Sequence, residues 1–109
     1  MHVEYVLCRL KGATYQDDRI DKLRPGAELT LRRDPSNIHD VNAIVVMGVV
    51  TSLGPEPVPL GYVTAHEAAR VAPHMDQGRS FAAVYAGHLW VMILAAPMGD
   101  ELKLTRFKR

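Results

Sequence analysis

The stretch that decides the fold is residues 31–46, LRRDPSNIHDVNAIVV. Residues 28–33, which lead into it, alternate leucines with polar side chains, and this period predicts a half-buried strand. Residues 34–42 are rich in Asp, Pro, Ser and Asn, which favour turns through a fixed φ or through side-chain hydrogen bonds to the backbone. Residues 43–50 are apolar and β-branched, as in a buried strand. The block therefore predicts two strands joined by a long polar loop.

Further β segments lie on both sides of this block. They are predicted at residues 3–11, 60–63, 80–86, 89–96 and 101–107. Residues 13–24 suit a loop or one helical turn, and residues 51–59, which hold three prolines, suit a surface loop. Closing about six short strands into a small barrel removes exposed strand edges. The sequence therefore predicts one mainly β domain over residues 1–109.

One helix is predicted after the strand at residues 60–63. Thr64 and Glu67 have the spacing of a capping box, in which each side chain satisfies a backbone N–H at the start of the helix. Residues at the i, i+3, i+4 and i+7 positions form one apolar face, namely Ala68, Val71, Ala72 and Met75. Pro73 lacks the N–H of the helical ladder, so we expect the helix to end or kink near it.

The totals limit the function. The 109 residues are 48% hydrophobic and carry a net charge of only +1, whereas strong non-specific nucleic-acid binders have a basic excess. Nucleic-acid binding must then rest on local clusters of charge. The lone Cys8 permits no internal disulfide and fits a reducing, cytoplasmic setting. The longest apolar run, residues 89–98, is too short to span a bilayer, so no membrane association is expected.

Residues 31–46 resemble the signature of the HIRAN domain. The matching positions are Arg33-Asp34-Pro35, a small polar pair, and Asp40-x-Asn42-Ala43-Ile44-x-Val46, followed by Leu60-Gly61-Tyr62-Val63 and Met75-Asp76-Gln77-Gly78. The resemblance implies an OB-like β-barrel with one short helix, of the free-standing bacterial type. It also implies binding of single-stranded DNA or DNA 3′ ends, in DNA repair or replication-fork processing.

The resemblance also implies site residues. By position, the pocket for the DNA end would be lined by Arg33, Asn37, His39 and Asp40, with Arg9, Arg32 and Tyr62 nearby. A carboxylate accepts a hydrogen bond from a 3′ hydroxyl but repels a 3′ phosphate, and arginine pairs with backbone phosphates. A planar ring can stack on a base. Where the family has two adjacent aromatic residues at the end of the first strand, this chain has Arg9 and Leu10.

Several of these residues also have ordinary structural interpretations. Asp34 and Asn42 suit turn-forming roles within the loop, and Asp40 could cap a turn as well as bind a ligand. Arg32 and Arg33 could be a solvated pair of surface charges. Trp90, with its apolar neighbours, is expected in the core, whereas Tyr62 suits either the core or a base contact.

Two other classes of function remain open. The near-neutral charge and the missing aromatic pair allow a protein-interaction module that has lost the DNA-end pocket. Cys8 and the five histidines raise the possibility of a hydrolase or metal enzyme, but no CxxC or HExxH spacing is present. There is also no Walker A loop. We therefore expect no enzymatic activity, cofactor or metal, and a helicase or nuclease as a partner acting in trans.

Overall fold

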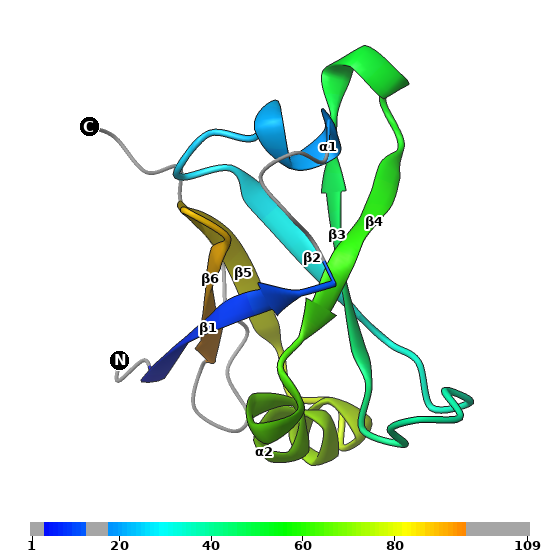
Figure 1. Ribbon diagram of the computed structural model, residues 1–109. Helices are drawn as coiled ribbons and strands as arrows, with labels where there is room; N and C mark the ends of the chain where they lie inside the picture. Colours follow the sequence, from blue (N-terminus) through cyan, green and yellow to red (C-terminus); the bar gives the residue numbers. More distant parts are fainter. Residues whose placement is uncertain (1–3, 13–17, 96–109) are drawn as a thin grey trace.

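The computed structural model describes residues 4–12 and 18–95, and this part of the chain forms a closed antiparallel barrel (Figure 1). Its strands are β1 (Glu4–Lys11), β2 (Glu28–Arg33), β3 (Ile44–Val49), β4 (Pro57–Val63), β5 (Phe81–Gly87) and β6 (Trp90–Ala95). Its helical segments are α1 (Asp18–Asp21), a 3₁₀ turn at Thr51–Leu53, and α2 (Ala65–Asp76). The order around the barrel is β1-β4-β3-β2-β5-β6. The mainly β, OB-like barrel with one main helix is confirmed, while the strand predicted at residues 101–107 lies outside the described residues.

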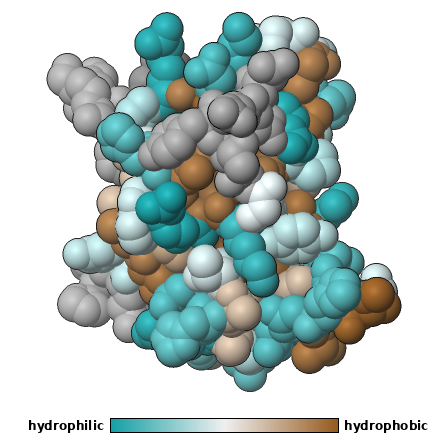
Figure 2. All heavy atoms as spheres, in the orientation of Figure 1, coloured by the Kyte–Doolittle hydropathy of each residue, from teal (hydrophilic) through white to brown (hydrophobic). Residues whose placement is uncertain are grey.

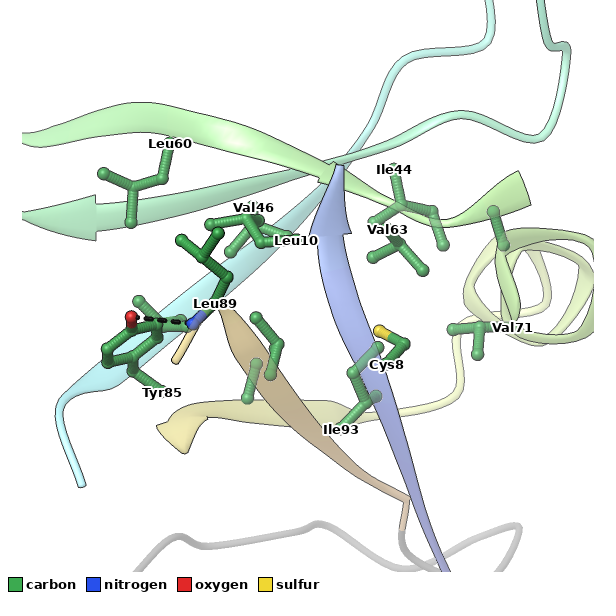
Figure 3. Close-up of a cluster of buried hydrophobic side chains, with 14 of the residues drawn as sticks. Cys8, Leu10, Ile44, Val46, Leu60, Val63, Val71, Tyr85, Leu89 and Ile93 are labelled. Atoms are coloured by element: carbon green, nitrogen blue, oxygen red, sulfur yellow. Dashed lines mark hydrogen bonds between the residues drawn. The ribbon is translucent and has the colours of Figure 1, made fainter. Parts of the chain in front are cut away.

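The core fills the barrel with side chains that point inward from alternate positions of each strand (Figure 3). The largest fully buried side chains are Ile44, Leu60, Ile93, Val46, Val50 and Val91. Each such side chain contributes roughly 1.5–3 kcal/mol when it leaves water. Helix α2 closes one end of the barrel with Ala68, Val71 and Ala72, which are all buried. The predicted apolar face of the helix is therefore the face that packs on the core.

Gly61 allows β1 and β4 to approach each other closely. A Cβ at this position would lie 2.6 Å from the carbonyl oxygen of Lys11 and 3.0 Å from the Leu10 side chain. These strands share only two paired positions, Leu10 with Val63 and Lys11 with Tyr62. Because the obstacle is backbone, a side chain here would force the strands apart at the point where the barrel closes.

The prediction of a surface loop over residues 51–59 is wrong at its end, because β4 begins at Pro57. Pro57 and Pro59 pair with β3, whereas the β1 partner joins β4 only at Tyr62 and Val63. Proline cannot donate a hydrogen bond to a second neighbouring strand, so it is tolerated where a strand has one neighbour. The first half of β4 is such a place.

The predicted limits of α2 need two corrections. The helix runs through Pro73 to Asp76, since a proline in the last turns removes only one ladder bond, and Gly78 follows with a positive φ of 85°. Thr64 is the N-cap residue, but its side chain makes no capping hydrogen bond, so the predicted capping box is wrong. Glu67 instead lies 3.3 Å from the Arg70 guanidinium. None of the described helices is long and apolar enough to cross a membrane.

Candidate nucleic-acid interface

The loop between β2 and β3, residues 34–42, is held by its own polar side chains. The Asn37 Oδ1 atom accepts hydrogen bonds from the backbone N–H groups of His39 (2.8 Å) and Asp40 (3.1 Å). The Asp40 Oδ1 atom accepts one from the N–H of Asn42 at 2.9 Å. The Asp34 N–H also donates to the carbonyl of Ala43 at 2.9 Å. The turn-forming residues therefore give the loop one defined shape.

Arg33 fastens this loop to α2. Its guanidinium donates to the carbonyl oxygens of Ala43 (2.7 Å) and Val41 (3.0 Å). It also forms a two-point contact with the Asp76 carboxylate, at 2.9 and 3.3 Å. The Arg33 side chain is only 15% exposed. We call this contact the Arg33–Asp76 clasp. It engages the guanidinium of Arg33, a residue that the family resemblance implies for the DNA pocket.

A hollow of about 240 Å³ lies beside the loop, and we call it the loop hollow. Four of the predicted site residues line it, namely Asn37, His39, Asp40 and Tyr62. Lys11, from the end of β1, lines it as well. Within residues 4–12 and 18–95, the second carboxylate oxygen of Asp40 accepts no hydrogen bond. The loop hollow thus combines a carboxylate oxygen available to a ligand with a nearby cation.

A second hollow of about 320 Å³ adjoins the first, and we call it the strand hollow because the outer face of β2, β3 and β4 lines it. It includes Arg19, Arg32, Asp34 and Val45, and it shares Gly12 and Tyr62 with the loop hollow. The Tyr62 hydroxyl donates to the Asp34 carboxylate at 3.4 Å. Tyr62 therefore lies between the two hollows with its hydroxyl directed to the loop.

The tip of the loop is apolar. Ile38 is 92% exposed and Val41 is 65% exposed, although they flank the polar residues of the loop hollow. Figure 2 shows hydrophobic atoms at the surface over this loop, at the lower right of the molecule. A hollow lined by both charged and apolar residues, with an apolar rim, suits a ligand that has both flat apolar faces and charged groups.

The comparisons with known proteins fit this barrel and loop. The sequence matches the HIRAN domain family over residues 3–104. The chain belongs to the HIRAN domain family. HIRAN domains are DNA-binding modules. No curated protein matches the sequence.

Two solved structures are similar to this HIRAN domain. The crystal structure of the HIRAN domain of human HLTF aligns with a TM-score of 0.66 at 19% identity, over 84% of this chain and 74% of that chain. A crystal structure of a protein from Lactobacillus plantarum aligns with a TM-score of 0.65 at 25% identity, over 86% of this chain and 97% of that chain. The first likeness, at this low identity, shows the fold.

Arg9 and Trp90 form a pair of their own on this HIRAN barrel. Arg9 lies opposite Trp90 on neighbouring strands, and its guanidinium is 5.3 Å from the centre of the indole ring. Trp90 is only partly buried, so the prediction of a core tryptophan is wrong. Its strand alternates, and Val91 and Ile93 are the residues that point inward. Arg9 lines neither the loop hollow nor the strand hollow.

Lys11 is the residue of the loop hollow that sequence reasoning missed. It is exposed, and within the described residues it has no ion-pair or hydrogen-bond partner for its side chain. The signal was its position, two residues after Arg9 and therefore on the same face of β1. Only the register, in which Lys11 lies opposite Tyr62, reveals that this face borders the loop.

The possible catalytic groups are separated by the fold. Burial raises the pKa of the Cys8 thiol, so near neutral pH it packs as a protonated, apolar side chain. His39 is exposed at the loop hollow, away from the core cluster that contains Cys8. The structure also places no group of three or more His, Cys, Asp or Glu side chains suited to a metal within the described ranges. The buried Cys8 and the exposed His39 therefore do not form a nucleophile–base pair.

Proposed function

We propose that this HIRAN domain binds single-stranded DNA and receives the 3′ end of the strand in the loop hollow. The observation that carries the proposal is that four predicted site residues line one hollow beside Lys11, namely Asn37, His39, Asp40 and Tyr62. The proposed setting is DNA repair or replication-fork processing in the cytoplasm, where a helicase or nuclease acts in trans.

Asp40 supplies the selectivity for a hydroxyl end. One of its carboxylate oxygens accepts the Asn42 N–H, which fixes the side chain, and the other is available to accept a hydrogen bond from a 3′ hydroxyl. A 3′ phosphate would instead bring like charges together, which is unfavourable at short range. The same carboxylate therefore favours one end and disfavours the other.

Lys11 and Tyr62 supply the contacts that do not depend on the sequence of the DNA. The Lys11 ammonium is available to a backbone phosphate, and the Tyr62 ring offers an aromatic surface at the edge of the loop hollow. Base stacking on an aromatic side chain is worth about 1–3 kcal/mol per base, comparable to several surface charge contacts. We therefore expect stacking to contribute most of the affinity.

Fluorescence anisotropy with 5′-labelled oligothymidylates tests the proposal at low and moderate salt. A strand with a 3′ hydroxyl should bind more tightly than the same strand with a 3′ phosphate. Asp40→Asn keeps an oxygen for the Asn42 N–H but removes the charge, and should abolish this preference; Asp21→Asn, an equal charge change away from the hollows, should keep it. Equal binding of both strands by the unmodified protein would contradict end recognition, and no binding at low salt would contradict DNA binding.

A protein partner is a second candidate ligand, favoured by a different part of the barrel. A hollow of about 400 Å³, which we call the helix hollow, lies between α2 and the ends of β1, β5 and β6. Its lining includes the buried apolar residues Val71 and Ile93 and the exposed Tyr5. A pull-down that recovers a protein after nuclease treatment, with no oligonucleotide binding, would favour this function.

A further inference from the structure

The strand hollow continues the loop hollow across the outside of the barrel. A row of four residues in register joins the two hollows, because Lys11 lies opposite Tyr62, Tyr62 opposite Val45, and Val45 opposite Arg32. Directly opposed residues of antiparallel strands point to the same face. The row spans three strand spacings, roughly 14 Å, which exceeds the size of a single nucleotide base. The two hollows therefore form one track with Tyr62 in the middle.

Val45 shows that this face is more than ordinary solvated surface. It is only 4% exposed, yet it lies outside the hydrophobic cluster that fills the barrel. Its register partners, Arg32 and Tyr62, lie on either side of it, and all three residues line the strand hollow. The floor of the strand hollow is therefore apolar, and its two walls are a guanidinium and an aromatic ring.

The charges of the strand hollow favour a phosphate. Arg32 is exposed and has no side-chain partner within the described part of the chain. Arg19 reaches the same hollow and donates to the carbonyl of Pro59 at 2.5 Å, which fixes its position. The carboxylate of Asp34 faces the same space, but it accepts hydrogen bonds from Ser36, Asn37 and Tyr62. Arg32 is therefore the cation of the strand hollow that is available to a phosphate, whereas the carboxylate of Asp34 is already engaged.

We propose that the strand hollow is a second nucleotide subsite, which holds the nucleotide on the 5′ side of the one in the loop hollow. The inference rests on the proposed function, and the polarity follows from Asp40, which places the hydroxyl end in the loop hollow. The phosphate that joins the two nucleotides passes Tyr62, and the next phosphate toward the 5′ end contacts Arg32. The DNA strand thus crosses β4 and β3 to β2.

Backbone amide NMR of the ¹⁵N-labelled protein, titrated with thymidine 5′-monophosphate, a thymidine dinucleotide and a hexanucleotide, tests this path. The mononucleotide should shift the resonances of His39, Asp40 and Val63, which border the loop hollow. The dinucleotide and hexanucleotide should also shift those of Arg32, Val45 and Leu60. If the longer ligands shift only the resonances around the loop hollow, the second subsite is wrong while the proposed function stands. If no ligand shifts either set, the proposed function fails.

An arginine variant provides a second test of the nucleotide subsite in the strand hollow. Arg32→Gln should weaken hexanucleotide binding three- to tenfold, and should leave the mononucleotide shifts around the loop hollow unchanged. Arg24→Gln is the matched control, since Arg24 is exposed and lines neither hollow, and it should change binding less than twofold. Equal hexanucleotide affinity for the two variants would overturn the proposal, as would an Arg32→Gln variant whose mononucleotide shifts are lost.

Discussion

The loop hollow and the helix hollow differ in what their charged side chains already contact. The helix hollow is the larger of the two, at about 400 Å³ against about 240 Å³, and Arg70, His74 and Arg79 line it. However, Arg70 lies 3.3 Å from Glu67, and the Arg79 guanidinium lies 5.9 Å from the centre of the Phe81 ring. In the loop hollow, Lys11 and one oxygen of Asp40 have no polar partner among residues 4–12 and 18–95. The choice of the loop hollow as the proposed DNA site therefore rests on its available polar groups, and not on volume or the number of cations.

Gly61→Ala should have the largest effect and should damage the loop hollow more than the helix hollow. The added Cβ would meet the Lys11 carbonyl and separate β1 from β4, which both border the loop hollow. We expect a loss of about 1–3 kcal/mol in the free energy of unfolding, typical of overpacking, together with weaker DNA binding. Urea unfolding and anisotropy measure the two effects. Gly12→Ala is not a suitable control because of its positive φ, so Ala86→Ser on exposed β5 surface serves instead.

Tyr62→Ala should remove the aromatic surface between the loop hollow and the strand hollow. Loss of one stacked base would weaken oligonucleotide binding by about 1–3 kcal/mol. Tyr62→Phe keeps the ring and loses only the 3.4 Å hydrogen bond to Asp34, so its binding should stay close to that of the unmodified protein. Anisotropy titrations compare the three proteins. An equal loss in both variants would show that the hydroxyl, and not the ring, matters.

Asp76→Ala should release the Arg33–Asp76 clasp and loosen the loop hollow from α2. Because Asp76 is 55% exposed, water screens the ion pair, and we expect a loss of only about 1 kcal/mol in unfolding free energy. DNA affinity should fall several-fold even though Asp76 does not line the hollow, since the loop loses one anchor. Glu56→Ala, in an exposed loop, is the control. Unchanged DNA affinity in Asp76→Ala would show that the internal hydrogen bonds of the loop suffice.

Arg70→Ala should have the smallest effect and is the direct test of the helix hollow. Arg70 is largely exposed and pairs with Glu67, so its removal should change the unfolding free energy by less than about 0.5 kcal/mol. Oligonucleotide affinity should change less than twofold, and its salt dependence should stay the same, because no phosphate contact is lost. A clear loss of affinity would move the DNA site, wholly or partly, to the helix hollow.

The sequence predicted the barrel well because its information is local. The alternation of residues 28–33 and the apolar run at residues 43–50 decide which side chains fill the core, and both strands are present. The same alternation places Arg33 on the face of Leu29 and Leu31, so its side chain points away from the side of Arg32. Adjacent arginines of equal charge therefore differ, since Arg33 contacts Asp76 whereas Arg32 is exposed.

The rest of the site depends on contacts between distant parts of the chain. The partner of Arg33 is Asp76, 43 residues further on, and no local pattern reveals it. Lys11 borders the loop only because the register pairs it with Tyr62. The apolar neighbours of Trp90 predict a core position, whereas the period of the strand puts Val91 inside and leaves Trp90 only partly buried. The partners of polar and charged side chains depend on how distant segments pair, whereas the burial of apolar side chains follows from the alternation along each strand.

The pairing of β1 with β6 has a consequence for how this domain can be joined to other proteins. Glu4 lies opposite Ala95, so the start of β1 and the end of β6 lie side by side (Figure 1). Lys11, at the other end of β1, is seven residues further on, roughly 23 Å away along the strand. A neighbouring domain attached at the Glu4–Ala95 end would not obstruct the loop hollow. The proposed DNA site and the Glu4–Ala95 pair thus lie at opposite ends of β1.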